Sequence, residues 1–289
     1  KNNLVYVNLH LKSGLFFGFL GPNGAGKTTV MKMICNLWKP TSGEIEVFGT
    51  PLMPDSYEVL KRMGSIIEFP AFYDNMTGYQ NLKLHCEYMG YYKHGCIENA
   101  LEMLGLKEAA GKKVKSYSLG MKERLGIARA ILCKPELLIL DEPTNGLDPA
   151  GMKQIRDLLK MLADEYNTTV LISSHILSEI ESIADTIGII HHGKLQKEIS
   201  MTEIEQMNLA YIEVKVSNTK QAAFVLSDKM ETQNFKIADN GEIRIYDSKI
   251  SIPELAKTFA LHDVEIFALG KKTETLEDYF LKMTAEVDK

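Results

Sequence analysis

The residues with the most specific chemistry form a glycine-rich stretch near the start of the chain. It follows a short apolar strand at 15–20 and precedes a helix pattern at 30–35. Glycines allow successive backbone N–H groups to turn inward around nucleotide phosphates, and the N-terminus of the following helix attracts the same negative charge. We therefore predict a phosphate-binding loop made of Gly21, Pro22, Asn23, Gly24, Ala25, Gly26, Lys27, Thr28 and Thr29.

Two side chains of this loop have distinct predicted roles. Lys27 would reach the β- and γ-phosphates, and the hydroxyl of Thr28 would ligate Mg²⁺. The loop by itself indicates only a nucleoside triphosphate as ligand, which would fit kinases, GTPases and motor proteins alike.

A pair of adjacent carboxylates narrows this choice. They end the segment 136–142, whose apolar run predicts a central parallel strand covered on both faces. Asp141, at the strand end, is the expected carboxylate on the Mg²⁺ side, the Walker B position. Glu142 is predicted to orient or deprotonate the water that attacks the γ-phosphate, a general-base role that contributes about 10²–10⁴ in rate.

The segment between these motifs points to a family. Ser118 is a good N-cap for an apolar helix, so a second helix N-terminus is available to an anion. Residues 117–121, Tyr-Ser-Leu-Gly-Met, resemble the signature motif Leu-Ser-Gly-Gly-Gln of ATP-binding cassette (ABC) ATPases. Ser118 and Gly120 retain the two functionally demanding positions of that motif, and the other three positions differ.

The motifs that follow keep the order of the same family. Residues 145–148, Asn-Gly-Leu-Asp, resemble the D-loop, and His175 follows the apolar strand 169–174, where the family has its switch histidine. Pro149, directly after Asp148, begins a helix with an apolar stripe. The resemblance covers about the first two-thirds of the chain, and its five motifs span residues 21–175.

The resemblance implies an α/β fold, a P-loop NTPase core of the ABC-ATPase type with a mixed sheet and a helical insertion. It also implies an ATPase that uses ATP and Mg²⁺ and closes as a dimer with a second ATP-binding subunit. Each site would combine the phosphate loop and Asp141 of one subunit with Ser118 and Gly120 of the other. Hydrolysis through Glu142 and His175 would reopen the dimer and drive a separate transmembrane permease.

Glu68 departs from the family pattern. It follows the predicted strand 64–67, where most ABC ATPases have a glutamine that reaches Mg²⁺ and the attacking water and leads into the membrane-subunit contact. A carboxylate can also ligate Mg²⁺, although it adds a charge beside a polyphosphate. We assign Glu68 and Asp148 to coupling, with Glu68 as a further candidate Mg²⁺ ligand.

The glutamate, the unusual signature and the β-rich tail together resemble the bacitracin and lantibiotic self-protection exporters. The resemblance implies export or removal of a peptide antimicrobial. A neutral drift from glutamine to glutamate is the alternative explanation of Glu68.

The chain is long enough for one large and one small domain. We predict an ABC ATPase domain at residues 1–200, with a helical subdomain at about 77–133, and a small α+β accessory domain at 208–289. The accessory domain reads strand-helix-strand-strand-helix-strand, which suggests a ferredoxin-like sheet, followed by an amphipathic helix at 276–281. A turn at 191–193 is predicted to join a hairpin.

Composition restricts the partners. A formal net charge of −5 argues against nucleic acid as a partner. No apolar run approaches the ~18 residues of a membrane span. The cysteines (Cys35, Cys86, Cys96 and Cys133) lack metal-like spacing and are expected to be reduced thiols. Together with the permease that the resemblance implies, this leads us to expect a peripheral protein at the cytoplasmic face of the cell membrane.

Family members have an aromatic residue upstream of the loop that stacks on adenine. Counting back places this position before Lys1, and Tyr6 and Phe16 belong to alternating strand patterns. We therefore expect the first strand and the stacking residue to be absent from this sequence.

Two other classes of function remain open at this level. A soluble ABC-type ATPase acting on nucleic acid or ribosomes usually carries tandem cassettes or long coiled-coil insertions, and this sequence has neither. A module that senses ATP without turnover would not need both Glu142 and His175.

Overall fold

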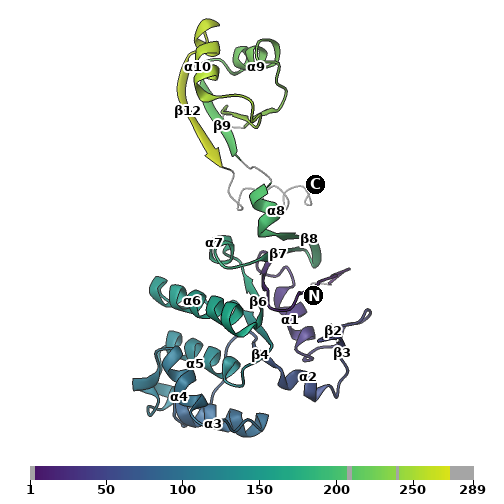
Figure 1. The fold of residues 1–289 in the computed structure, drawn as a ribbon, viewed down its shortest axis with the longest axis vertical. Helices are drawn as coiled ribbons and strands as arrows, with labels where there is room; N and C mark the ends of the chain where they lie inside the picture. Colours follow the sequence, from purple (N-terminus) through teal and green to yellow (C-terminus); the bar gives the residue numbers. More distant parts are fainter. Residues whose placement is uncertain (1–3, 207–209, 239–240, 274–289) are drawn as a thin grey trace. The chain divides into compact units, whose positions relative to one another are not determined.

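The computed structural model describes residues 4–206, 210–238 and 241–273, and the chain divides into two units, Lys1–Met201 and Thr202–Lys289. Figure 1 shows the elements of both units along the colour ramp. Each unit has its own hydrophobic core. The helix predicted at 276–281 lies outside the described residues.

A six-stranded mixed sheet forms the frame of the first unit. Its strands are β1 (Phe16–Leu20), β4 (Met63–Ile66), β5 (Leu137–Asp141), β6 (Thr169–Ser174), β7 (Thr186–His191) and β8 (Lys194–Ser200). They lie in the order β4-β5-β6-β1-β7-β8, with every pairing parallel except that of β8 with β7. β1, β5 and β6 are buried at every position, as expected of central parallel strands.

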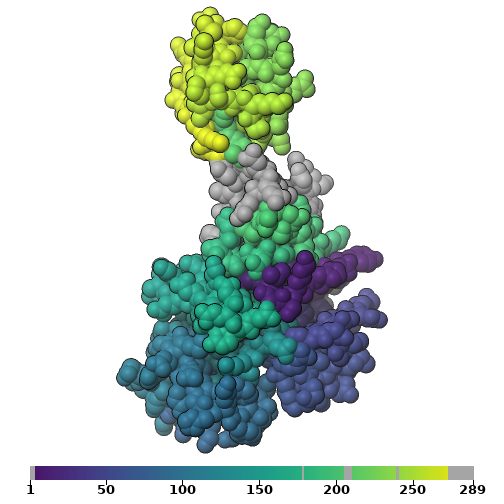
Figure 2. Space-filling view, viewed as in Figure 1, coloured from purple at the N-terminus to yellow at the C-terminus, as the bar shows by residue number. Residues whose placement is uncertain are grey.

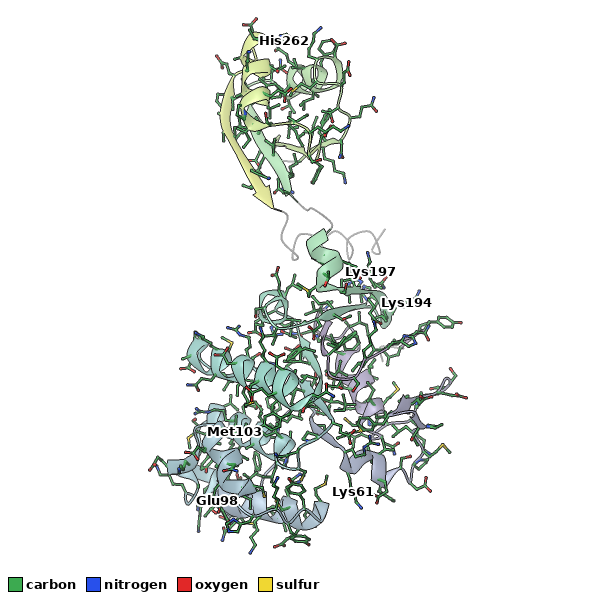
Figure 3. The ribbon with its side chains drawn as sticks, in the orientation of Figure 1. Lys61, Glu98, Met103, Lys194, Lys197 and His262 are labelled. Atoms are coloured by element: carbon green, nitrogen blue, oxygen red, sulfur yellow. The ribbon has the colours of Figure 1, made fainter. Side chains whose placement is uncertain are left out.

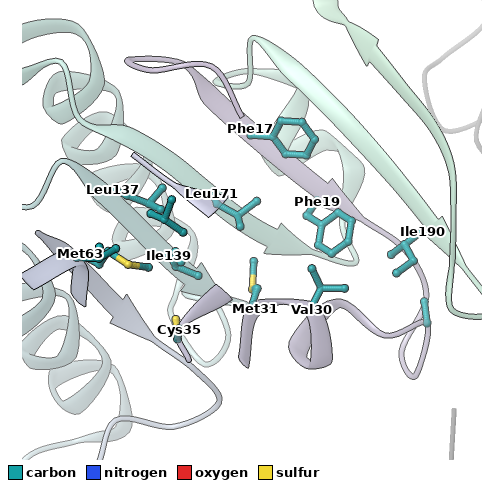
Figure 4. Packing of buried hydrophobic residues seen from close by; sticks show 13 residues of the cluster. Phe17, Phe19, Val30, Met31, Cys35, Met63, Leu137, Ile139, Leu171 and Ile190 are labelled. Atoms are coloured by element: carbon teal, nitrogen blue, oxygen red, sulfur yellow. The ribbon is translucent and has the colours of Figure 1, made fainter. Parts of the chain in front are cut away.

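One face of the sheet is covered by α1 (Lys27–Ile34). Val30 and Met31 of this helix pack against Phe17 and Phe19 of β1, in the cluster that Figure 4 shows. The cluster continues across β5 and β6 through Ile139 and Leu171. The helix that leaves the phosphate loop is therefore fixed to the sheet by apolar contacts over its length.

The opposite face is covered by α6 (Pro149–Tyr166) and α7 (Leu177–Glu181), as Figure 1 shows for α6. A Cβ at Gly18 of β1 would lie 2.1 Å from Ile180 Cγ2, so only glycine leaves room for α7 there. The predicted stripe of α6 is confirmed, since Ile155, Leu158, Leu159 and Leu162 are buried.

The helical insertion consists of α3 (Gly78–Met89), α4 (Cys96–Met103) and α5 (Leu119–Ile131), and its surface is blue in Figure 2. A capping box begins α3, with Thr77 and Gln80 exchanging hydrogen bonds. Gly90 ends α3 in the left-handed conformation. Two 3₁₀ turns, Lys107–Ala109 and Val114–Ser116, connect α4 to α5.

The remaining elements of the first unit lie near its surface. β2 (Glu46–Val47) and β3 (Thr50–Pro51) form a small hairpin, followed by α2 (Tyr57–Lys61). The edge strand β8 carries Lys194 and Lys197, labelled in Figure 3, and lysines on an edge strand discourage pairing with another chain. The turn predicted at 191–193 does join β7 to β8.

The second unit is an antiparallel sheet with two helices. After α8 (Met201–Gln206) come β9 (Ala210–Val216), α9 (Thr219–Asp228), β10 (Phe235–Ile237), β11 (Ile243–Ile245), α10 (Ile252–Leu261) and β12 (Ile266–Thr273). The strand order is β10-β11-β9-β12, the split β-α-β arrangement of a ferredoxin-like sheet. Its core is formed by Val214, Leu226, Ile243, Leu255 and Phe259, among others.

One element prediction is wrong. The strand pattern around Tyr6 forms no strand: residues 4–11 are irregular, and Tyr6 has a φ of 54° and is 89% exposed. The apolar alternation instead serves packing, because Leu9 and Leu11 lie against the core of the first unit while Val5 N donates to Gly193 O at 2.8 Å. Phe16 does lie in a strand and is buried.

A buried carboxyl on α5 predicts a pH dependence of stability. Burial raises the pKa of Glu123 from 4.5 to about 7. The folded state therefore binds this proton more tightly than the unfolded state, so the stability contribution of Glu123 is lost as pH rises from about 4.5 towards 7. We expect Glu123→Gln to gain stability relative to the wild type between pH 5 and pH 8, measured by urea unfolding at several pH values.

Glu165→Gln is the matched control, because Glu165 is an exposed glutamate on α6. Its difference from the wild type should stay flat over the same range. A flat difference for Glu123→Gln as well would contradict the assignment of this titration to Glu123.

Candidate active site

The phosphate loop lies between the end of β1 and the start of α1. Gly24 and Gly26 have φ values of 81° and 113°, a left-handed region that glycine enters without strain. Gly26 is the N-cap of α1 and makes no side-chain cap, so the first N–H groups of the helix are available to an anion. The predicted strand-loop-helix context is present.

The phosphate loop packs against the end of β7 and the turn that follows it. A Cβ at Gly21 would lie 2.3 Å from Ile190 O, so the backbones meet closely there. Gly193 N donates to Ala25 O at 2.9 Å. Pro22, Asn23 and Gly24 are exposed, whereas Ala25 to Lys27 are buried and Thr28 and Thr29 are partly buried.

The ammonium of Lys27 is held inside the loop. Lys27 Nζ donates to Gly21 O at 2.6 Å and lies 3.3 Å from Glu142 Oε1. The Lys27 side chain is 6% exposed and that of Glu142 is 17% exposed. Because both charges are largely removed from water, each is the main compensation of the other.

Thr28 and Asp141 are in direct contact. Thr28 Oγ1 donates to Asp141 Oδ2 at 2.7 Å, and Ser173 Oγ donates to the other oxygen, Oδ1, at 2.6 Å. Ser173 Oγ also accepts from Glu142 N at 2.9 Å. The parallel register explains this geometry, since Asp141 on β5 is directly opposite Ser173 on β6. Ser173 was missed in the sequence, where its only signal is a hydroxyl inside a buried strand.

Glu142 and His175 also meet. Glu142 Oε2 lies 2.7 Å from His175 Nδ1, and because a carboxylate only accepts, the proton of this bond is on Nδ1. Glu142 has a φ of 51°, an unusual value for a residue with a side chain. Strain of this kind persists only where the surrounding structure holds it, and it is concentrated at functional sites. Lys27, Glu142 and His175 thus form one continuous chain of contacts.

Glu68 has a different partner from the one its motif suggests. Its Oε1 accepts from Lys32 Nζ at 2.7 Å, and its side chain is 59% exposed. Glu68 also has a positive φ, 61°. Within the described residues, no hydrogen bond or ion pair joins Glu68 to Thr28 or Asp141. Its predicted contact with Mg²⁺ therefore stays a prediction, and its observed contact is with α1.

The signature segment begins α5 as expected. Ser118 Oγ accepts from Met121 N at 3.3 Å and caps the helix. Tyr117, at the first signature position, is buried and its hydroxyl donates to Ala109 O at 2.7 Å. A Cβ at Gly78 would lie 2.4 Å from this hydroxyl. Tyr117 is therefore a packing residue of the insertion, paired with a glycine on α3.

The signature also packs against the D-loop of the same chain. A Cβ at Gly120 would lie 3.2 Å from Leu147 Cδ2, and a Cβ at Gly146 would lie 2.7 Å from Leu119 Cδ2. Asp148 caps α6 by accepting from Gly151 N at 2.9 Å. Among the contacts of the described residues, none joins Ser118 or Gly120 to the phosphate loop of this chain.

Sequence reasoning missed a second set of polar residues beside these loops. Glu179 of α7 is buried, and its Oε2 accepts from Thr144 Oγ1 at 2.9 Å. The same oxygen lies 3.3 Å from Ser174 Oγ. The only sequence signal is a glutamate four residues after His175, in a helix too short to show a periodicity.

The comparisons with known proteins agree with this geometry. A family model described as "ABC transporter" matches residues 4–145. An uncharacterized ABC transporter ATP-binding protein of Bacillus subtilis, YcbN, is 54% identical over 96% of this chain and 90% of its own length. The bacitracin transport ATP-binding protein BcrA of Bacillus licheniformis is 44% identical over 98% of this chain and 92% of its own length.

A solved structure resembles about two-thirds of the chain. It is a dimeric, post-hydrolysis state of the ATP-binding cassette MJ0796 bound to ADP and Pi, with a TM-score of 0.62 and 27% identity. The match covers 68% of this chain and 90% of that one. The α/β fold of an ABC ATPase predicted from the sequence is therefore shared with a known cassette.

Ser173 provides a test of the site that does not alter a charged group. Ser173→Ala removes two hydrogen bonds and leaves Asp141 Oδ1 and Glu142 N to find other partners. A buried group left unpaired costs about 1–3 kcal/mol, so we expect the turnover number for ATP to fall by about tenfold or more. A steady-state phosphate-release assay would measure this.

Ser227→Ala is the control, because Ser227 is an exposed serine on α9 of the second unit. It should match the wild type. Full turnover in Ser173→Ala would mean that the carboxylates hold their places without the hydroxyl.

Proposed function

We propose that this chain, which belongs to the ABC transporter family of ATP-binding proteins, powers the export of a peptide antimicrobial through a separate membrane subunit. As a member of that family it binds and hydrolyses ATP. The likeness to the bacitracin transport protein carries the proposal, because it extends over 98% of this chain. It thus includes the small C-terminal unit as well as the nucleotide site.

The phosphate loop, residues 21–29, is proposed to bind the ATP phosphates with its backbone N–H groups and with Lys27. Lys27 now faces Glu142 at 3.3 Å, so an arriving phosphate competes for the same ammonium. When Lys27 turns to the phosphates, Glu142 loses its cationic neighbour and keeps the contact with His175. ATP binding therefore supplies the negative charge that releases the catalytic carboxylate.

Mg²⁺ is the proposed metal. The fit rests on the pair Thr28 and Asp141, whose oxygens meet at 2.7 Å and are hard donors of the kind Mg²⁺ prefers. The ion would neutralise charge on the β- and γ-phosphates. Ser173 keeps Asp141 oriented through its other oxygen.

A second copy of the chain is proposed to complete each site. Ser118 and Gly120 begin a long helix whose N-terminus can bind an anion, and they make no described contact with the phosphate loop of their own chain. A γ-phosphate held between two helix N-termini would join the subunits. The dimer seen for the MJ0796 cassette, a 27% identical structure, supports this arrangement.

Glu142 and His175 are proposed to perform the hydrolytic step. Glu142 accepts the proton of the attacking water, and His175 donates to the carboxylate from Nδ1 and so fixes its orientation. Loss of the γ-phosphate removes the group that joins the subunits. Asp148, at the start of α6, is proposed to report this opening through the D-loop.

The membrane part must come from a partner. ABC ATP-binding subunits work with transmembrane permeases, and none of the helices described for this chain combines the length and apolarity that crossing a bilayer requires. We propose a peripheral position at the cytoplasmic face of the membrane, on such a permease. The alternative of a nucleic-acid or ribosome-directed ATPase is less favoured, because the chain carries a net charge of −5.

Glu142→Gln tests the hydrolytic role. It keeps the size of the side chain but cannot accept a proton, so we expect turnover to fall by about 10²–10⁴. ATP binding should remain and an ATP-dependent dimer should accumulate, as seen by size-exclusion chromatography. Cells carrying this variant with the permease should lose bacitracin resistance. Turnover within about tenfold of the wild type would remove Glu142 from this role.

Glu68 tests the link to the permease. Glu68→Gln keeps one acceptor for Lys32 but removes the ion pair seen at 2.7 Å. We expect the isolated subunit to keep appreciable ATPase activity with Gln, while resistance conferred with the permease falls. Glu68→Ala should lower hydrolysis as well, with fold and dimerisation retained. Glu58→Gln, at an exposed ion pair on α2, is the control. Wild-type resistance with Glu68→Gln would mean that the change from glutamine to glutamate at this position is neutral for function.

A further inference from the structure

A buried carboxylate with no role in the proposed function lies beside the hydrolytic pair. Glu179, on α7, is 7% exposed, and no cation forms an ion pair with it among the described residues. A buried charge without a counter-ion depends on hydrogen bonds for its compensation. Those bonds come from two places, the end of β6 directly before His175 and the turn that follows Glu142.

The first bond reaches the loop of His175. Ser174 Oγ lies 3.3 Å from Glu179 Oε2 and 3.2 Å from Ile176 O, and its single proton can be donated to one of them at a time. Ser174 Oγ also accepts a hydrogen bond from Ile176 N at 2.9 Å. Ser174 therefore connects the residues on both sides of His175 to the carboxylate of Glu179.

The second bond reaches the turn after Glu142. Thr144 Oγ1 donates to Glu179 Oε2 at 2.9 Å, and Thr144 O accepts from Leu147 N at 3.2 Å, which closes the D-loop turn. Leu147 in turn lies next to Gly120, as the 3.2 Å distance from a Cβ at that glycine shows. One carboxylate oxygen is thus shared by the loop of His175 and by the turn that leads to the signature.

We propose that Glu179 is a positioning residue that keeps the loop of His175 and the D-loop turn in one common arrangement. Glu179 touches no substrate in this scheme. It keeps His175 aligned with Glu142. Because Glu179 also bonds Thr144, a movement of His175 would shift the D-loop turn that contacts the signature segment. The proposal rests on the proposed function, because the alignment matters only if Glu142 and His175 hydrolyse ATP.

Three variants separate this role from a general loss of stability: Glu179→Ala, Glu179→Gln and Glu181→Ala. Glu181 lies on the same helix and is exposed, so it is the matched control. For each variant, the measurements are the turnover number, the dissociation constant of a non-hydrolysable ATP analogue and the melting temperature. Glutamine keeps an acceptor for Thr144 and so tests whether the hydrogen bond or the charge is needed.

We expect Glu179→Ala to lower turnover by about tenfold or more, since it leaves buried hydroxyls unpaired, while the analogue binds within about threefold of the wild type. Glu179→Gln should recover most of the turnover, and Glu181→Ala should match the wild type. If Glu179→Ala melts below the assay temperature, Thr144→Val breaks the same bond from the other side and should show the same split.

A double-mutant cycle with Thr144→Val and Glu179→Ala tests the connection itself, because each single variant removes the bond between Thr144 and Glu179. Residues in one hydrogen-bond network have non-additive effects, so the double variant should lose less turnover than the product of the two single losses. Multiplicative losses, or turnover within about twofold of the wild type in Glu179→Ala, would overturn the proposal. Failure of the proposed function would appear elsewhere, as full hydrolysis in Glu142→Gln.

Discussion

The parallel pairing of β5 with β6 is the constraint on which the rest of the site depends. Its register sets Asp141 opposite Ser173, so that one hydroxyl bonds both the Asp141 carboxylate and the backbone N–H of Glu142. Glu142 directly follows Asp141, the last residue of β5, while Ser174 ends β6 and is followed by His175. Because carboxyl ends of parallel strands meet at one edge of the sheet, two motifs far apart in the chain form one site. A shift of one residue in this register would separate them.

Charge balance at that edge follows from the same arrangement. The Lys27 ammonium is compensated by Glu142 and by the Gly21 carbonyl inside the loop. The positive φ of Glu142 indicates that the backbone is held in an uncommon conformation to aim this carboxylate. The contacts of this edge and the geometry of the candidate catalytic carboxylate therefore depend on the same few residues.

The departures from the family pattern have different physical origins. Tyr117 replaces a smaller signature residue and is accommodated because Gly78 has no side chain, so this change concerns packing within the insertion. Glu68 forms an exposed ion pair with Lys32 of α1, which connects the segment after β4 to the helix that leaves the phosphate loop. Of the two, only Glu68 contacts the helix that leaves the phosphate loop. The proposed coupling role therefore rests on this departure and not on Tyr117.

Local sequence patterns determined the strand-loop-helix of the phosphate site, the capped starts of α3, α5 and α6, and the order of strands and helices in the second unit. Glycine conformation, helix capping and apolar periodicity each depend on only a few neighbouring residues, so the sequence alone shows them. Partners far apart in the sequence needed the tertiary structure: Ser173 bonding Asp141, Lys32 bonding Glu68, and Glu179 bonding Thr144. These contacts join elements many residues apart, and only strand register and helix placement decide them. The irregular course of residues 4–11 has the same cause, since an alternating apolar pattern shows what can be buried but not whether a neighbouring strand is free to pair.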